Sequence, residues 1–226
     1  MSKLSKLHEK IRLKIRKFYI KKTAKSRQKK IHCKNFTIIS NNCWAGTIYQ
    51  SYNLPYQTPT IGLFILPDDY LKFVSDLKNY LKKDLVFIDS KESKQYQILH
   101  EEINFPVARL GDIEIYFMHY HSEAEVIEKW QRRCKRINFD NILYKFSDQN
   151  FCTKKHLETF MSLSLKNKVC FSSKNYNIDG IIVLGESFGR ENSTKGGINA
   201  SYEPFGSNRH ININNLINNI TCSKKD

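Results

Sequence analysis

The chain has 226 residues, 40% of them hydrophobic and 12% aromatic, which excludes a wholly disordered protein and suits one α/β domain with an appended segment. Its net charge of +15 is uneven, because the first 34 residues hold 14 Lys and Arg against the single acid Glu9, leaving only +2 on the remainder. The sequence therefore predicts a nearly neutral domain behind a basic arm.

Several classes of protein and site are disfavoured at this level. The sequence contains no run of 18 apolar residues, so no transmembrane helix is predicted, and no secretory signal is recognisable. We therefore expect a cytoplasmic location. The six cysteines form no C-x-x-C pair, and no metal site is predicted. Neither a G-x-G-x-x-G nor a Walker A motif appears.

Residues 3–30 predict an amphipathic helix with one apolar stripe, and Lys and Arg fill most of its other positions; the stripe consists of Leu4, Leu7, Ile11, Ile15 and Phe18. A cationic helix of this kind favours an anionic membrane surface as its partner, here the inner membrane face. The alternative is a solvated helix or a disordered arm. Nucleic acid is the less favoured partner, because no RNA- or DNA-binding motif follows.

Strand-like and helix-like segments then alternate. Apolar runs predict strands at 36–40, 62–66, 85–88, 113–120, 142–146, 168–171 and 181–184. Helices are predicted at 44–50, 67–83, 122–136 and 153–163, with Pro67 and the capping box of Ser122 and Glu125 as start signals. This alternation predicts an α/β fold: a three-layer, mostly parallel sheet with helices on both faces.

The pattern fades after residue 184. We expect an arm at 1–33, an α/β domain at 34–184 and an Asn/Gly-rich segment at 185–226, in which only 209–220 predicts a weak helix. Gly185–Gly189 matches the G-x-S-x-G pattern of serine hydrolases around Ser187. A nucleophile elbow needs a helix directly afterwards, and the polar residues 190–199 predict a poor one, so a plain turn is favoured.

Four polar segments follow predicted strands: 41–44, 119–122, 147–150 and 172–174. Because ligands bind beyond the carboxyl ends of parallel strands, we expect these segments to share one rim. Asn41 and Asn42, with Ser147 and Gln149, are candidates to bind sugar hydroxyls or a phosphate; a helix cap and a turn are the alternative for the two asparagines.

Each candidate for chemistry has a structural alternative. Cys43 is a candidate nucleophile, although a buried cysteine is favoured, and Trp44 stacks either on a sugar or in the core. His119 and His121 are candidate bases, although a structural role for at least one is favoured. The acids Asp112 and Asp148 serve either as bases or as turn caps.

Arg132 and Arg136 lie on one face of the predicted helix at 122–136. Their guanidinium groups are suited to clamping a pyrophosphate or an acidic sugar. A solvated helix face is the simpler interpretation. The cofactor stays open, with a nucleotide sugar or another activated group as the possible donor.

Ordered segments between about Lys34 and Lys174 support a family assignment: 38–46 (Ile-Ile-Ser-Asn-Asn-Cys-Trp-Ala-Gly), 54–65, 105–115, 119–138, 145–150 and 168–174. They resemble a bacterial family of unknown function often labelled exopolysaccharide biosynthesis protein. The resemblance implies an α/β fold and a place in capsule, exopolysaccharide or O-antigen gene sets, but no catalytic residues. Ala45 departs from the glycine usual there, and the chain after Tyr176 matches poorly.

The leading hypothesis is a transferase that acts on lipid-linked or nascent cell-surface polysaccharide at the inner membrane face. The alternative is a non-catalytic assembly protein of the same pathway that binds glycan or a partner. A nucleic-acid-binding adaptor is the weaker alternative.

Overall fold

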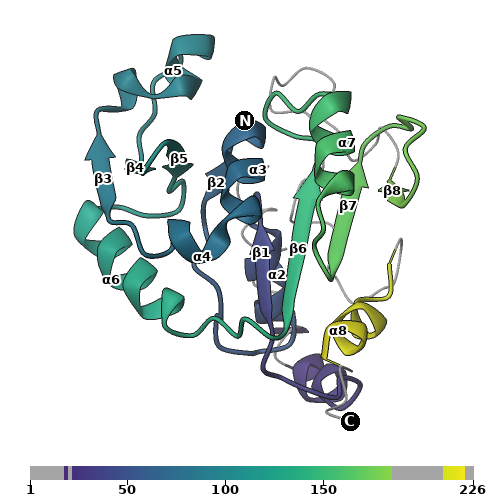
Figure 1. Ribbon diagram of the computed structural model, residues 1–226. Helices are drawn as coiled ribbons and strands as arrows, with labels where there is room; N and C mark the ends of the chain where they lie inside the picture. The colour runs from purple at the N-terminus through teal and green to yellow at the C-terminus, as the bar shows by residue number, and fades with distance from the viewer. Residues whose placement is uncertain (1–17, 20–21, 185–210, 222–226) are drawn as a thin grey trace, which may run out of the picture.

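The computed structural model describes residues 18–19, 22–184 and 211–221 (Figure 1). Most of the predicted arm and the Gly185–Gly189 motif with Ser187 lie outside the described residues. Residues 22–28 are helical, in agreement with the end of the predicted arm, and α8 (Ile213–Thr221) confirms the weak helix expected at 209–220. No helix in the described ranges is long and apolar enough to cross a membrane.

The predicted parallel sheet is present. It has the order β1 (Thr37–Ser40), β6 (Ile142–Ser147), β7 (Lys168–Ser172) and β8 (Ile181–Val183), and each neighbouring pair is parallel. Nearly all residues of β1, β6 and β7 are buried, as expected for strands covered on both faces.

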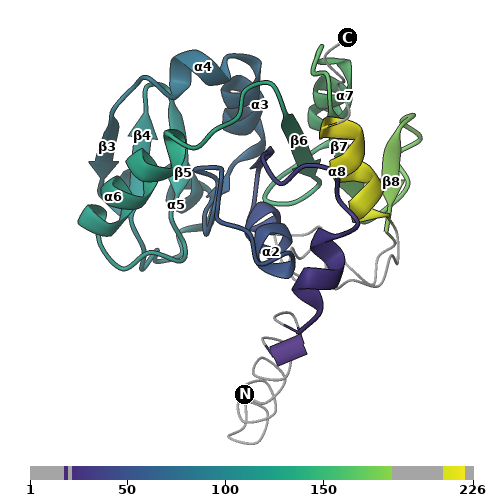
Figure 2. The same cartoon turned by 90° about the horizontal axis from the view of Figure 1, so that it is seen from below.

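Helices cover both faces of this sheet, which confirms the three-layer arrangement. On one face α2 (Trp44–Ser51) and α8 pack in one apolar cluster with Leu143 and Phe171. On the other face α3 (Pro67–Ser75) and α7 (Lys154–Ser162) pack against Phe146 and Cys170. Figure 2 shows α3 and α7 on one side of the parallel strands and α2 on the other.

A second, antiparallel sheet lies beside the first (Figure 1). Its order is β2 (Phe64–Ile65), β5 (Ile113–Tyr116), β4 (Val107–Leu110) and β3 (Leu85–Ile88). The remaining elements of this region are α4 (Leu77–Tyr80), η1 (Ser90–Glu92), α5 (Lys94–Leu99) and α6 (Glu123–Cys134). The alternation of elements did not reveal this sheet, because β4 was not predicted and β4 and β5 form a hairpin through Gly111 (φ +66°) and Asp112.

The chain leaves β1 in one direction and β6 in the other. After α2 it reaches β2, where the backbone N–H of Ile65 donates to the carbonyl of Asn41 (3.1 Å), and from β6 it continues to β7 and β8 on the opposite side. The connections after β1 and after β6 therefore lead to opposite sides of this pair of strands, which makes the gap between them a topological switch point. In open α/β sheets, ligands bind beyond the carboxyl ends of the strands at such a switch point.

Candidate functional site

Two of the four predicted polar segments meet at the switch point. The side-chain amide of Asn42 donates to Gln149 Oε1 (2.9 Å) and to Ser147 Oγ (3.2 Å), and that of Asn41 donates to the Ser147 carbonyl (3.1 Å). Asn42 Oδ1 also accepts from the backbone N–H of Trp44 (3.0 Å), so Asn42 binds the start of α2 as well. The ends of β1 and β6 are thus joined by side chains.

A buried lysine that was not among the predicted site residues lies beneath these residues. Lys145 is 0% exposed, and its Nζ donates to Ser147 Oγ (2.8 Å) and Asn41 Oδ1 (3.3 Å) and lies 5.9 Å from the centre of the Phe171 ring. A signal was available, because Lys145 interrupts the apolar strand at 142–146. A charge at such a position is rare unless it is paired.

Asp148 brings a third predicted segment to this edge. Its Oδ2 accepts from the backbone N–H and the hydroxyl of Ser173, both at 2.8 Å, after the end of β7. Its buried Oδ1 has no hydrogen-bond partner in the part of the chain that the structure describes. Burial raises the pKa of Asp148, against the opposing effects of the Ser173 hydrogen bonds and the Lys145 charge. We call Asn41, Asn42, Lys145, Ser147, Asp148 and Gln149 the carboxyl-edge cluster.

The backbone directly after this cluster is strained. Asn150 and Phe151 have φ values of +53° and +68°, a region that asparagine tolerates and a bulky side chain rarely adopts. Consecutive residues of this kind persist only where the surrounding structure holds them, and they gather at functional sites.

Cys43 and Trp44 have structural roles here. Burial raises the pKa of the Cys43 thiol to about 11, although Lys145 opposes this, so the thiol is protonated at neutral pH and is a weak nucleophile. The Trp44 ring is fully buried and packs 5.7 Å from the ring of Phe171. Neither side chain presents the reactive or stacking surface considered from the sequence.

The two histidines follow β5, which belongs to the antiparallel sheet. His119 and His121 are exposed, and their backbone N–H groups donate to the Gly62 carbonyl (3.0 Å) and to Glu125 Oε2 (2.9 Å). Met118, which precedes His119, contacts Cys43, the residue after Asn42 (Sδ to Sγ, 3.9 Å). Among the described residues, neither imidazole ring makes a hydrogen bond to the carboxyl-edge cluster, and the expectation that residues 119–122 share its rim stays a prediction.

Asp112, Arg132 and Arg136 occupy surface positions. Asp112 lies in the hairpin turn, where hydrogen bonds from Lys72 (2.8 Å) and Tyr80 (2.7 Å) hold its pKa well below the usual range. Arg132 pairs with Glu128 one helical turn away (2.7 Å), and Arg136 Nη1 lies 3.5 Å from the Tyr56 carbonyl. The two arginines thus have different partners, and a common anion clamp stays a prediction.

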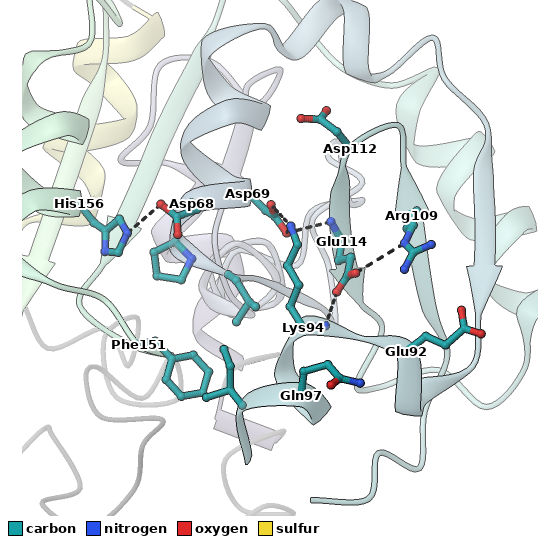
Figure 3. A pocket seen from close by; sticks show the side chains of 13 residues that line it. Asp68, Asp69, Glu92, Lys94, Gln97, Arg109, Asp112, Glu114, Phe151 and His156 are labelled. Carbon is teal, nitrogen blue, oxygen red and sulfur yellow. Dashed lines mark hydrogen bonds and ion pairs between the residues drawn. The ribbon is translucent and has the colours of Figure 1, made fainter. Parts of the chain in front are cut away.

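An open pocket of about 650 Å³ lies between α3, α5, β4, β5 and the start of α7 (Figure 3). We call it the acidic pocket, because it is lined by five carboxylates, by Lys94, Arg109 and His156, and by apolar side chains; the carboxylates are Asp68, Asp69, Glu92, Asp112 and Glu114. Phe151, on the strained loop after Asp148, also lines it. Within the described ranges, no group of three or more His, Cys, Asp and Glu is placed to hold a metal ion.

Comparisons with known proteins give a family and one close relative. A family profile described as a domain of unknown function (DUF1919) matches residues 14–219. An uncharacterized protein of Haemophilus influenzae is 35% identical over 160 residues, which is 71% of this chain and 71% of the relative. The profile covers both the carboxyl-edge cluster and the acidic pocket.

Proposed function

This chain belongs to the DUF1919 family, and from that premise we propose that it is a transferase acting on bacterial cell-surface polysaccharide, with the carboxyl-edge cluster as its reaction site. The resemblance to proteins labelled for exopolysaccharide biosynthesis suggests the polymer. The position of the cluster at the switch point between β1 and β6 suggests the site.

The observation that carries the proposal is Asp148. The residue is 6% exposed, Ser173 fixes one carboxylate oxygen, and the other oxygen has no hydrogen-bond partner among the described residues. A buried carboxylate with a raised pKa at a ligand-binding edge has the properties of a general base. Asp148 Oδ1 would take the proton of an acceptor hydroxyl as that oxygen bonds to the transferred group, while the donor's leaving group departs with the bonding electron pair.

The electrostatics of the cluster suit an activated donor with a phosphate leaving group. Burial is the main cause of the pKa shifts of Cys43, Asp148 and Cys170, and the Lys145 charge opposes it in all three. The ammonium group therefore makes the potential at this edge more positive, which favours a departing anion. The amides of Asn42 and Gln149 would orient the donor or the acceptor.

The test replaces Asp148 by Asn in the full-length protein and supplies a polyprenyl-linked acceptor with a panel of nucleotide sugars and other activated donors. We expect wild type to give product by mass spectrometry and Asp148→Asn to lose about 10²- to 10⁴-fold in rate, the usual contribution of a general base. Asp179→Asn, an exposed carboxylate before β8, is the matched control and should keep its rate.

Equal rates for Asp148→Asn and wild type would remove Asp148 as the base. No turnover by wild type with any donor, together with retained glycan binding, would favour the second candidate, a non-catalytic glycan-binding protein of the same pathway. That candidate is supported by the many hydrogen bonds that Asn41, Asn42, Ser147 and Gln149 make with one another, which are typical of a rigid recognition surface.

We further propose that the protein works at the inner membrane face. The basic stripe of residues 3–30 supports this location, since each Lys or Arg near an anionic surface contributes about 1 kcal/mol. The described end of the arm docks on the domain, where the Arg27 guanidinium donates to the Ser51 carbonyl (2.8 Å) and Gln28 donates to the Tyr52 carbonyl (2.6 Å). A membrane-bound arm would therefore hold the domain close to the lipid.

A further inference from the structure

The acidic pocket is a separate feature from the carboxyl-edge cluster, and its wall is already neutralised. Lys94 Nζ contacts both oxygens of the buried Asp69 (2.6 and 2.8 Å), and the Glu114 backbone N–H donates to Asp69 as well (3.0 Å). Glu114 accepts from the Lys94 backbone N–H (2.9 Å) and the Tyr116 hydroxyl (2.8 Å). These buried acids therefore form a rigid wall (Figure 3), with their charge balanced by Lys94 and by Arg109, 3.6 Å from Glu114.

The acids at the opening are less constrained. Glu92 is exposed, and the side chain of Asp68 is 83% exposed. Only one oxygen of Asp68 contacts His156, at 3.0 Å from Nε2. Since the Thr153 backbone N–H can only donate, His156 Nδ1 accepts from it (2.9 Å), and Nε2 carries the proton that bonds Asp68. Asp68 and Glu92 therefore keep oxygens available to accept hydrogen bonds from a ligand.

The pocket also has apolar surface next to these acceptors. Pro67, Ile98 and Phe151 line it, and Ile98 is 56% exposed. A pocket with apolar surface and a few polar groups, with a volume between about 300 and 1,000 Å³, is typical of small-molecule sites. A sugar ring has the matching character, because its C–H face packs on apolar side chains while its hydroxyls donate to carboxylates.

The charge of the pocket selects among sugars. Of the five carboxylates, Asp69 and Glu114 are balanced by Lys94 and Arg109, and Asp112 pairs with Lys72 outside the pocket wall (2.8 Å). The two carboxylates at the opening have no Lys or Arg partner in the pocket wall. A uronic acid or a phosphosugar would place a like charge beside Asp68 and Glu92, which is unfavourable.

We propose that the acidic pocket binds an uncharged sugar unit of the glycan and rejects anionic units. The identity of the ligand as the acceptor polymer rests on the proposed function, whereas binding itself requires no turnover. Phe151 links the acidic pocket to the carboxyl-edge cluster along the chain, because it lines the pocket and follows Asp148 by three residues in the same strained loop.

The test measures binding to the full-length protein by saturation-transfer NMR, with maltotriose, chitotriose and galactotriose as neutral probes and trigalacturonate as the anionic probe. We expect at least one neutral probe to bind and trigalacturonate to bind at least about threefold more weakly. Ile98→Ala should weaken the neutral probe by about threefold or more. Ile127→Ala, a 40% exposed isoleucine on α6, is the matched control and should leave binding unchanged.

A second variant tests whether the carboxylates at the opening exclude anionic sugars, because removing them should strengthen the binding of trigalacturonate. Asp68→Asn with Glu92→Gln removes both charges at the opening, and we expect trigalacturonate to bind at least about threefold more tightly than it binds wild type. No binding of any neutral probe, or no gain with this double variant, would overturn the proposal. Asp148→Asn should still bind the neutral probe, so a failure of the acidic pocket can be told apart from a failure of Asp148 as base.

Discussion

Lys145 and Asp148 are three residues apart at the end of β6, and their charges are satisfied differently. The Lys145 ammonium is held by Ser147 and Asn41, whereas Asp148 has one oxygen with two hydrogen bonds and one with none among the described residues. A buried carboxylate in such surroundings destabilises the native state when it ionises. Functional sites often keep groups of this kind although they lower the stability of the native state.

The cost predicts a pH dependence. Because burial raises the pKa of Asp148 in the native state above its unfolded value of about 3.9, the native state binds more protons than the unfolded state in the interval between them. The free energy of unfolding therefore falls as the pH rises through that interval. Asp148→Asn removes this contribution, so its free energy of unfolding should rise relative to that of wild type as the pH rises above about 4, until Asp148 is ionised in the native state.

Urea unfolding at several pH values measures this difference. Each unit of pKa shift corresponds to about 1.4 kcal/mol, so even a moderate shift is detectable. Asp179→Asn should show no such trend. A difference between Asp148→Asn and wild type that stays constant with pH would contradict a raised pKa for Asp148.

At the scale of single residues, the sequence predicted that Asn41, Asn42 and residues 147–149 lie at the carboxyl ends of strands, because apolar runs show where strands end. Core packing was the favoured interpretation of Trp44, and its burial confirms it. The sequence could not predict that β5, which leads to His119 and His121, joins the antiparallel sheet. Which sheet a strand joins depends on its neighbours, and a single strand's sequence does not contain that information.

Among the elements, the hairpin of β4 and β5 decides where the loop after β5 goes. That loop packs against Gly62, just before β2, and Gly62 has φ +71°. A β-carbon there would lie 3.2 Å from His119 Cβ and 3.3 Å from Tyr120 Cε2. Glycine thus permits both the backbone conformation and the close approach of the two segments.

Gly62→Ala should lower the free energy of unfolding by about 1–3 kcal/mol, since a left-handed conformation alone costs an alanine about 1–2 kcal/mol. Gly46→Ala in α2 is the control, because its β-carbon would meet only ordinary contacts with Ile61 (3.6 Å). That variant should be neutral or stabilised by up to about 1 kcal/mol. Thermal denaturation of both proteins measures the effect, and equal melting temperatures would contradict it.

The sequence predicted where helices begin more reliably than it predicted which strands pair in a sheet. Pro67 and the Ser122–Glu125 pair marked the starts of α3 and α6, because capping signals are local. The antiparallel sheet depended on β4, whose four residues 107–110 include the exposed Arg109 and are too short to stand out from their surroundings.

Over the whole molecule, the net positive charge is concentrated in the N-terminal arm. Residues 1–34 hold 14 of the 37 basic residues of the chain, and the described end of the arm is fixed both to the end of α2 and to α8, where Asn218 Oδ1 accepts from the His32 backbone N–H (2.8 Å). The arm is thus joined to the domain at a defined point.

Replacing Lys3, Lys6, Lys10 and Lys14 by Gln should weaken binding to phosphatidylglycerol vesicles by up to about 10²- to 10³-fold, at about 1 kcal/mol for each charge. Co-sedimentation at low and high salt measures the loss. Lys91, Lys135, Lys155 and Lys174, exposed on the domain, provide a control variant with the same change in net charge. Equal losses for the two variants would show that total charge, and not the arm, determines binding.

The separation of β1 from β6 has a consequence during synthesis on the ribosome. Ser40 pairs with Lys145, so an apolar strand at the start of the domain waits for a partner more than 100 residues downstream. At about 5–20 residues per second, that wait lasts about 5–20 s. The antiparallel unit between them can fold first, and a nascent chain arrested before residue 142 should expose β1 to chaperones.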